Sequence, residues 1–270
     1  MLMANSWYED LNAYIRLGEP KLKKKAAAWQ TAIGLQAVDG LSVSDYLLKT
    51  AKENIEGKIT DKEANAQISN YYEDCCDRYV IEAGTKEADI VAGQIASLLA
   101  EKIVSFTPAL WMSVHRYLFK DVFMHAGKIR TYNIYKNEWV LNGKSVFYAS
   151  YDSIPMTMEY DFKTEAAFSY KNLSKDDISR HLAQFTCDIW QIHPFGEGNT
   201  RSTAVFLIKY LSSLGYSINQ ECFAKKSWYF RNALVRANYN NLPNDIHATT
   251  LYLEMIFEIP KRLHQLLLHF

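Results

Sequence analysis

The residues with the clearest chemical potential are residues 193–201, which read HPFGEGNTR. They place an imidazole, a carboxylate, two glycines and a guanidinium within one short turn. An imidazole can take a proton near neutral pH, a carboxylate can hold a divalent cation, and glycines let the backbone approach an anion. Because a helical pattern follows the turn, its first amides lack partners within the helix and attract anions. The segment therefore predicts a phosphate site with a metal ligand and a base beside it.

The same turn joins one amphipathic helical pattern to another, whereas P-loops and dinucleotide-binding turns join a strand to a helix. We therefore exclude both of those folds. Each residue of the turn also has a simpler interpretation, since a lone His at a helix end is usually a cap and a lone Glu is usually solvated. The combination of Gly-Glu-Gly-Asn with His193 at one turn favours a functional site.

The segment resembles the signature of Fic-domain proteins, His-x-Phe-x-(Asp/Glu)-Gly-Asn-Gly-Arg-x-x-Arg, and it matches the first seven positions. A helical core, a hairpin before the signature and helices after it extend the resemblance to about residues 85–260. The resemblance implies a nucleotidyltransferase, a protein adenylyltransferase that transfers AMP from ATP to a Ser, Thr or Tyr hydroxyl of a target protein and needs Mg²⁺.

The resemblance also implies roles for three residues of the turn. His193 would be the general base that takes the proton of the attacking hydroxyl, and an unperturbed pKa of about 6.5 suits that task at neutral pH. Glu197 would hold Mg²⁺ against the phosphate oxygens. Phe195 would be buried and would fix the loop that carries the imidazole.

The remaining residues of the turn would bind phosphate: Gly198, Asn199 and the Thr200 amide as a cradle, and Arg201 as a clamp through its planar guanidinium. Two positions depart from the family pattern. Thr200 stands where Gly is usual; it keeps its N–H, although its Cβ limits how closely a ligand can come. Ala204 stands where the second Arg belongs, and no basic residue follows Arg201 within one turn. The orientation of ATP, and so the identity of the donor, stays open.

A second, partial resemblance lies in residues 42–57, which form an amphipathic helical pattern that ends at a glycine. Many Fic proteins carry an inhibitory, antitoxin-like helix with the motif (Ser/Thr)-x-x-x-Glu-(Gly/Asn), whose Glu enters the nucleotide site and pairs with the second Arg. Here Glu56 and Gly57 match, and Lys52 takes the Ser/Thr position. Glu56 as an exposed residue before a Gly cap explains the pattern equally well.

Asn142-Gly143 stands between two β-prone runs within residues 138–148, a spacing that predicts a β-hairpin. By the resemblance, this hairpin is a flap that registers the target's modifiable residue by main-chain pairing. A structural flap with no partner is an equal alternative. The residues assigned to target docking are Glu138, Trp139, Val140, Leu141, Asn142 and Gly143.

The rest of the chain predicts helices. It has 11 Gly and 6 Pro, about half of the usual Gly+Pro usage, and scarce punctuation of this kind favours long helices. Thr60 with Glu63 and Ser174 with Asp177 form helix-starting boxes. We expect an all-α fold, a Fic-like helical bundle with a β-hairpin flap and an N-terminal helical extension. Residues 1–84 would form the extension and residues 85–270 the catalytic domain with its C-terminal helices.

Composition narrows the class of protein further. With 30 Lys+Arg and 30 Asp+Glu, the chain has no cationic field for nucleic acid or an anionic membrane. No signal or membrane-spanning pattern is present, so we expect a cytoplasmic protein. The four cysteines lack zinc-site spacing and are expected to be reduced, packed thiols: Cys75, Cys76, Cys187 and Cys222.

Four other functions stay open. A Fic-like transferase could use another phosphate-containing donor such as UTP, or could remove AMP. A nucleotide-binding interaction module without turnover is the alternative from another class, and a DNA-binding regulator is a distant third. The target protein, its modified residue, the biological trigger and self-association into a homo-oligomer are not determined by the sequence.

Overall fold

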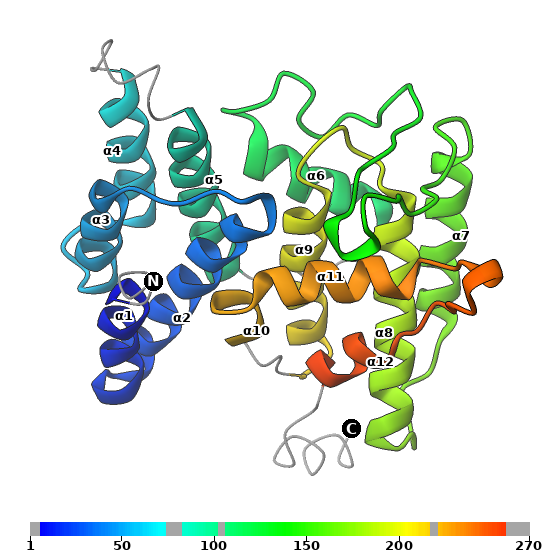
Figure 1. Cartoon of the computed structure of the whole chain (residues 1–270). Coiled ribbons are helices and arrows are strands. Elements are labelled where there is room, and N and C mark those ends of the chain that lie inside the picture. Colours follow the sequence, from blue (N-terminus) through cyan, green and yellow to red (C-terminus); the bar gives the residue numbers. More distant parts are fainter. Residues whose placement is uncertain (1–5, 74–82, 102–105, 217–220, 258–270) are drawn as a thin grey trace. The chain divides into compact units, whose positions relative to one another are not determined.

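The structure, a computed structural model, describes residues 6–73, 83–101, 106–216 and 221–257, and it is built from helices joined by turns and loops (Figure 1). Among these residues no strand is formed, and β pairing is limited to two isolated antiparallel bridges, Glu138–Lys144 and Asn241–Ile246. The all-α prediction is confirmed for this part of the chain.

The chain divides into two compact units, and the first takes in Met1–Lys102, Tyr117–Met124 and Gln220–Ser227. Its helices are α1 (Ser6–Leu17), α2 (Pro20–Gly34), α3 (Asp45–Ile55), α4 (Asp61–Glu73), α5 (Ala83–Ala100) and α10 (Glu221–Ala224), with a 3-10 turn over Leu35–Asp39. Helix α5 packs against α2 and α4 and is buried continuously over residues 88–98. Helix α5 thus packs with the helices before it, and the expected domain boundary near residue 84 stays a prediction.

Local capping explains where α3 and α4 begin and end. Ser44 caps α3 by accepting a hydrogen bond from the Leu47 N–H at 3.1 Å, and Gly57 follows the helix with a positive φ of 75°. Thr60 and Glu63 exchange the two predicted bonds, Thr60 N–H to the Glu63 carboxylate at 2.7 Å and Glu63 N–H to the Thr60 hydroxyl at 3.2 Å. The capping box and the glycine stop are confirmed, and α3 begins three residues later than the pattern predicted.

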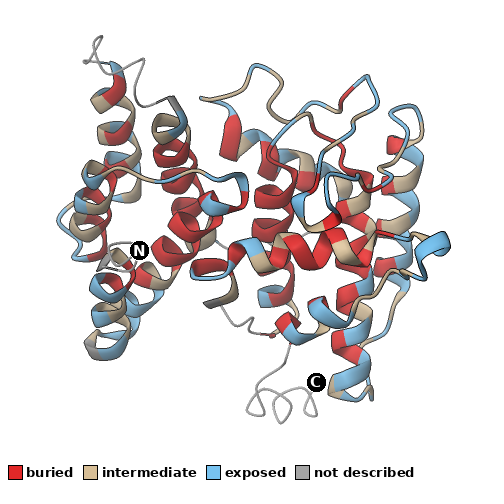
Figure 2. Ribbon diagram, viewed as in Figure 1, coloured by how far each residue is buried: buried red, intermediate tan, exposed pale blue. Residues whose placement is uncertain are grey.

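The second unit takes in Ile103–Arg116, His125–Asn219 and Trp228–Phe270. Its helices are most of α6 (Pro108–Phe119), α7 (Ile154–Ala167), α8 (Lys175–Ile192), α9 (Asn199–Ser213), α11 (Ser227–Ala237) and α12 (Leu251–Glu254), with 3-10 turns over Trp139–Leu141, Leu242–Asn244 and Met255–Phe257. The predicted N-cap of α8 is present, with the Asp177 N–H donating to the Ser174 hydroxyl at 3.1 Å. Every residue of α9 from Asn199 to Leu211 is buried, which makes it the central helix of this unit (Figure 2).

An aromatic core connects α6, α7 and α9 to the turn of residues 193–198. The ring centroids of Trp111 and Phe195 lie 5.8 Å apart, and those of Phe162 and Phe206 lie 5.5 Å apart. Phe195 is buried as expected. Because aromatic pairs of this kind add packing energy to their burial, the turn is fixed on the core rather than left as a free loop.

The predicted β-hairpin is not formed in the described structure. Asn142 and Gly143 do take positive φ, 53° and 83°, but only the single Glu138–Lys144 bridge flanks them. Between these residues the chain forms a 3-10 turn, in which the Leu141 N–H donates to Glu138 O at 3.0 Å and the Asn142 N–H to Trp139 O at 3.1 Å. The 3-10 turn uses the peptide groups that the hydrogen-bond ladder of a β-hairpin would need. The Asn-Gly pair therefore specified the tight turn and not the strands.

Two of the four cysteines lie among the residues that the structure describes. Cys187 is buried and Cys222 is half-buried, whereas Cys75 and Cys76 lie outside the described residues. In the ranges that the structure describes, no helix combines the length and apolar character needed to cross a membrane.

Candidate active site

The candidate site lies at the turn between α8 and α9, where both ends depend on left-handed backbone. His193 ends α8 with φ 47° and ψ 58°, and Gly198 begins α9 with φ 74°. A glycine adopts this conformation without strain, whereas His193 needs support from its surroundings. These two left-handed residues set the path of the turn that links His193 to the first amides of α9.

His193 is held as a neutral, buried imidazole. Its side chain is 3% exposed, and its Nδ1 lies 3.1 Å from the carbonyl oxygen of Trp190, which can only accept a hydrogen bond. The proton is therefore on Nδ1, and Nε2 keeps its lone pair. Burial, and then the charge of Lys136, hold the pKa of His193 well below its usual value. The base is thus unprotonated at neutral pH by a wider margin than an unperturbed imidazole would be.

Asn199 closes the turn upon itself. Its Oδ1 accepts from the Phe195 N–H at 3.0 Å, and its Nδ2 donates to the Phe195 carbonyl at 2.8 Å. Both functions of the amide are therefore committed to the shape of the loop, in a side chain that is buried. The expected phosphate role of Asn199 stays a prediction, to which its backbone N–H at the start of α9 remains suited.

The side chain of Thr200, at the position where the Fic signature has Gly, forms a hydrogen bond within the site. Its hydroxyl accepts a hydrogen bond from the indole Nε1–H of Trp190 at 3.1 Å. The threonine therefore joins α9 to the last turn of α8, next to the carbonyl that holds His193. Its own backbone N–H is the second of α9, one of the first-turn amides available to an anion.

The guanidinium expected to clamp phosphate is buried. Arg201 is 2% exposed, and Ala204, one turn further along α9, is fully buried. Neither side chain reaches the surface, so the clamp role of Arg201 stays a prediction.

Glu197, the expected metal ligand, presents its carboxylate to solvent and to a lysine from a distant loop. Its side chain is 57% exposed, and its Oε2 lies 3.2 Å from Nζ of Lys136. The described residues contain no cluster of three or more His, Cys, Asp or Glu side chains that could hold a metal. One exposed carboxylate fits Mg²⁺ only together with phosphate oxygens and water, which is the usual manner in which nucleotide enzymes hold this ion.

Arg130 anchors the site from the loop after α6. Its guanidinium donates to main-chain oxygens of His193 (2.8 Å), Tyr132 (2.6 Å), Ala149 (2.5 Å) and Ile192 (3.3 Å). The backbone N–H of Arg130 donates to the Pro194 carbonyl at 2.8 Å. Two of these oxygens belong to the C-terminal end of α8, where the helix dipole favours a cation. Sequence reasoning missed this residue, because its partners are backbone carbonyls that leave no mark in the sequence.

His115 supports the loop from beneath. Its Nδ1 accepts from the Gly127 N–H at 2.9 Å, so its Nε2 carries the proton and donates to the Glu197 carbonyl at 2.9 Å. Its ring stacks on Phe195 with centroids 3.7 Å apart, and burial lowers its pKa to about 4. The sequence offered one signal for it: His115 lies four residues after the core residue Trp111, on the buried face of α6.

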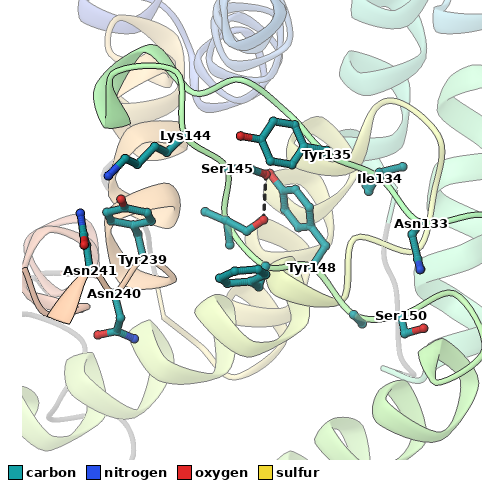
Figure 3. A pocket seen from close by; sticks show the side chains of 13 residues that line it. Asn133, Ile134, Tyr135, Lys144, Ser145, Tyr148, Ser150, Tyr239, Asn240 and Asn241 are labelled. Carbon is teal, nitrogen blue, oxygen red and sulfur yellow. Dashed lines mark hydrogen bonds between the residues drawn. The ribbon is translucent and has the colours of Figure 1, made fainter. Parts of the chain in front are cut away.

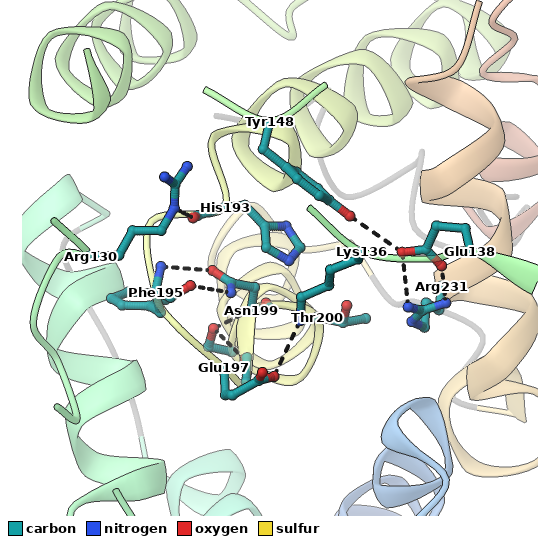
Figure 4. A network of polar contacts seen from close by, with 12 residues as sticks. Arg130, Lys136, Glu138, Tyr148, His193, Phe195, Glu197, Asn199, Thr200 and Arg231 are labelled. Atoms are coloured by element: carbon teal, nitrogen blue, oxygen red, sulfur yellow. Dashed lines mark hydrogen bonds and ion pairs between the residues drawn. The ribbon is translucent and has the colours of Figure 1, made fainter. Parts of the chain in front are cut away.

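Glu138 joins the predicted target-docking segment to α11. It is buried, and its carboxylate meets the guanidinium of Arg231 through two contacts of 2.6 and 3.0 Å (Figure 4). The Tyr148 hydroxyl lies 3.4 Å from the same carboxylate, and its ring lies 4.1 Å from that of His193. The structure thus assigns Glu138 an internal anchoring contact, while Trp139 beside it is 69% exposed.

The other predicted docking residues follow the same turn. Val140 is half-buried, Leu141 is buried, and Asn142 and Gly143 are exposed at its tip. A cavity of about 450 Å³ lies beside this segment, lined by Tyr135, Tyr148, Tyr239 and neighbouring residues (Figure 3). Since Tyr148 also contacts His193, the cavity and the imidazole share one wall.

Glu56 lies in the first unit, at the end of α3. Tyr14 donates a hydrogen bond from its hydroxyl to the Glu56 carboxylate, and Lys58 forms an ion pair with it at 2.6 Å. Both contacts lower the pKa of Glu56, and the contact with Lys58 has the larger effect. The hydrogen bond to Glu56 raises the pKa of Tyr14 to about 12. The carboxylate thus has local partners, and its inhibitory role stays a prediction.

The part of the chain that carries this site is similar to known proteins. The sequence model of the Fic/DOC family matches residues 105–211. A probable protein adenylyltransferase Fic of Escherichia coli K12 is 25% identical over 145 residues, which are 54% of this chain and 64% of that protein. A probable protein adenylyltransferase of Sinorhizobium fredii is 28% identical over 130 residues, or 48% of this chain and 64% of the relative. The match thus spans less than two thirds of each of these relatives.

Solved structures agree on the fold. The N-terminal Fic domain of a Bartonella effector protein superposes with a TM-score of 0.53 at 16% identity, covering 68% of this chain and 84% of that one. The Fic domain of a putative cell filamentation protein from Bartonella quintana, solved with bound ADP, gives a TM-score of 0.51 at 20% identity and covers 70% and 92%. The signature, the helical fold and the family match agree, and the chain is similar to Fic/DOC family proteins over residues 105–211.

Proposed function

We propose that this protein is a protein adenylyltransferase, which transfers AMP from ATP to a hydroxyl side chain of a target protein with Mg²⁺. The observation that carries the proposal is the state of His193: a neutral imidazole whose Nδ1 proton is held by Trp190, immediately before the amide-lined start of α9. The names of the curated relatives, probable protein adenylyltransferases, support the same activity.

In the proposed reaction, the oxygen of the target hydroxyl attacks the α-phosphorus of ATP. The bond from that phosphorus to the β-phosphate oxygen breaks, and pyrophosphate leaves. Nε2 of His193 accepts the hydroxyl proton, and the charge on the resulting imidazolium is shared through Nδ1–H with the Trp190 carbonyl. The amides of Asn199, Thr200 and Arg201 at the start of α9 would face the phosphate oxygens.

Glu197 would hold the Mg²⁺ ion, because it is the exposed carboxylate next to the amide-lined helix start. Bound there, the ion would neutralise phosphate charge and orient the leaving group. The residues from Glu138 to Gly143 would dock the target, with the exposed Trp139 and the tip at Asn142 and Gly143 as the available surface. The cavity beside Tyr148 offers room for a target side chain near the imidazole.

The test is the intact mass of the purified full chain after incubation with ATP and Mg²⁺, since self-modification would reveal the activity without a known target. Wild type should gain one AMP adduct, and His193→Ala should gain none while it still binds nucleotide. His247→Ala, at an exposed histidine, is the matched control and should behave as wild type. An adduct in His193→Ala would contradict the assigned base.

Parallel incubations with the other nucleoside triphosphates test the donor, which Ala204 leaves open. If only UTP gives an adduct, UTP and not ATP is the donor. Nucleotide binding without any adduct would favour the interaction module.

Glu56→Gly belongs in the same series. If Glu56 inhibits, this variant should label faster than wild type, and the gain should be modest because Ala204 cannot supply the expected arginine partner. An unchanged labelling rate would remove Glu56 from the regulation of the site.

A further inference from the structure

We propose that Lys136 is the second cationic group of the anion site, and that its ammonium binds the nucleotide's β- and γ-phosphates in place of the arginine absent at position 204. This inference rests on the proposed function, because it names a residue that binds the donor. It accounts for the way in which a domain that lacks the second arginine of the signature could still orient a triphosphate.

The position of Lys136 supports this role. Its Nζ lies 3.2 Å from Oε2 of Glu197, the expected metal ligand, and its charge is also felt at His193. Figure 4 shows the side chain extending from its loop toward Glu197, beside the imidazole. The ammonium therefore stands between the candidate base and the candidate metal ligand, where the phosphates of a bound nucleotide would lie.

Two of the arginines around the site have other partners. Arg130 donates to four main-chain oxygens, and Arg231 is paired with the buried carboxylate of Glu138. Arg201 is 2% exposed. Of the cationic side chains described around the turn, Lys136 is the one whose partner is a largely exposed carboxylate.

That pairing is one that a ligand can exchange. The Glu197 carboxylate is 57% exposed, so water can replace the lysine as its partner at little cost. A divalent cation on Glu197 would repel the ammonium, and the phosphates that accompany the cation would attract it. The lysine side chain suits such a transfer, because it is a point charge with three donors on a flexible stem.

The experiment is calorimetric titration of the full-length protein with ATP, ADP and AMP in the presence of Mg²⁺. Lys136→Met keeps most of the side-chain volume and removes the charge, whereas Lys136→Arg keeps the charge. Lys128→Met, at an exposed lysine earlier in the same loop region, is the matched control. A thermal melt of each variant verifies that it is folded.

We expect Lys136→Met to weaken ATP binding at least tenfold and AMP binding less than threefold. Lys136→Arg and Lys128→Met should stay within threefold of wild type for ATP. Equal ATP affinity in wild type and Lys136→Met would overturn the proposal, and so would equal losses for ATP and AMP, since these would indicate a disturbed loop.

The outcome is separable from that of the adenylyltransferase proposal. A wild-type protein that binds ATP but forms no adduct would refute the proposed transfer and leave the binding comparison decisive for Lys136. A wild-type protein that binds none of the three nucleotides would overturn both.

Discussion

Nε of Arg130 donates a hydrogen bond to the main-chain oxygen of His193 at 2.8 Å, so the residue that carries the candidate base is held through its backbone by a guanidinium from another loop. The left-handed conformation of His193 is unfavourable for a side chain other than Gly, by about 1–3 kcal/mol. Arg130 offsets this cost by satisfying the carbonyls at the end of α8, and it thereby fixes the direction of the imidazole.

Replacing Arg130 should therefore disturb the orientation of His193, although Arg130 lies in another loop. Arg130→Lys keeps the charge but loses the planar guanidinium that reaches several carbonyls. Arg130→Met also removes the charge and leaves those carbonyls without the donors that Arg130 supplies. We expect a stability loss of about 2–4 kcal/mol for Arg130→Met and at least a tenfold drop in the rate of AMP transfer for both variants. Urea unfolding and labelling rates measure the two effects, with the exposed Arg180→Lys as control. A wild-type labelling rate in Arg130→Lys would refute the positioning role.

Asn199 provides a test of loop closure. Asn199→Asp keeps an acceptor for the Phe195 N–H but faces the Phe195 carbonyl with an oxygen, whereas Asn199→Ala loses both bonds. Both variants should lose stability, by about 1–3 kcal/mol, and nucleotide affinity should fall in each because the amides of α9 are no longer held in place. Calorimetric titration with ATP and Mg²⁺ reports the affinity. Unchanged binding in Asn199→Ala would show that the loop keeps its shape without this amide.

The rate of AMP transfer should stay high below pH 6.5. Burial and the Lys136 charge lower the pKa of His193, so the neutral base persists to a lower pH than an unperturbed imidazole would. The acid limb of kcat/KM should therefore lie below pH 6.5, and Lys136→Met should move it to higher pH because a positive charge is removed. A pH–rate profile of labelling checks both statements. An acid limb at or above pH 6.5 in wild type would contradict the buried, neutral base.

Folding stability should also depend on pH through His115. Its pKa is about 4 in the folded protein and about 6.5 when unfolded, so protonation favours the unfolded chain. The contribution is complete above pH 6.5 and is lost as pH falls toward 4, by at most about 3 kcal/mol.

His193 should contribute in the same direction, because its pKa is also lowered. His115→Gln should be less stable at pH 7 and should show a flatter slope between pH 6.5 and 4. Adding His193→Ala should flatten it further. Urea unfolding at a series of pH values measures the slopes, and a slope that His115→Gln leaves unchanged would show that His115 is not the titrating group.

The tip at Asn142 allows the docking role to be separated from a structural one. Asn142 has φ 53° and donates its N–H to Trp139 O, both of which proline forbids. Asn142→Pro should lower target modification more than nucleotide binding, whereas Asn142→Gly, which tolerates positive φ, should preserve both. Labelling of a target and calorimetric titration with ATP give the comparison. Equal losses in Asn142→Pro would make the segment scaffold only.

Signals carried by neighbouring residues were sufficient to predict several features of this protein. Thr60 with Glu63, and Ser174 with Asp177, predicted helix starts because a cap is complete within four residues. The turn of residues 193–199 was recognisable because its glycines and Asn199 act on the backbone of the turn itself. The Asn-Gly pair likewise predicted its own dihedral angles, but strands also need partners, and the 3-10 turn and the buried Glu138–Arg231 pair determine the path of the flanking chain.

Only the tertiary structure decided how the candidate base is tuned and held. The pKa of His193 follows from burial and from Lys136, and its orientation depends on Arg130; both residues lie about sixty positions away in the sequence. His115 supports the loop from another helix by bonds to the backbone. By itself, the sequence determined the helices, the turn and the residue types of the site. Desolvation and charge proximity arise only when distant segments pack, and hydrogen bonds to main-chain carbonyls do not require any particular residue type, so no sequence pattern records them.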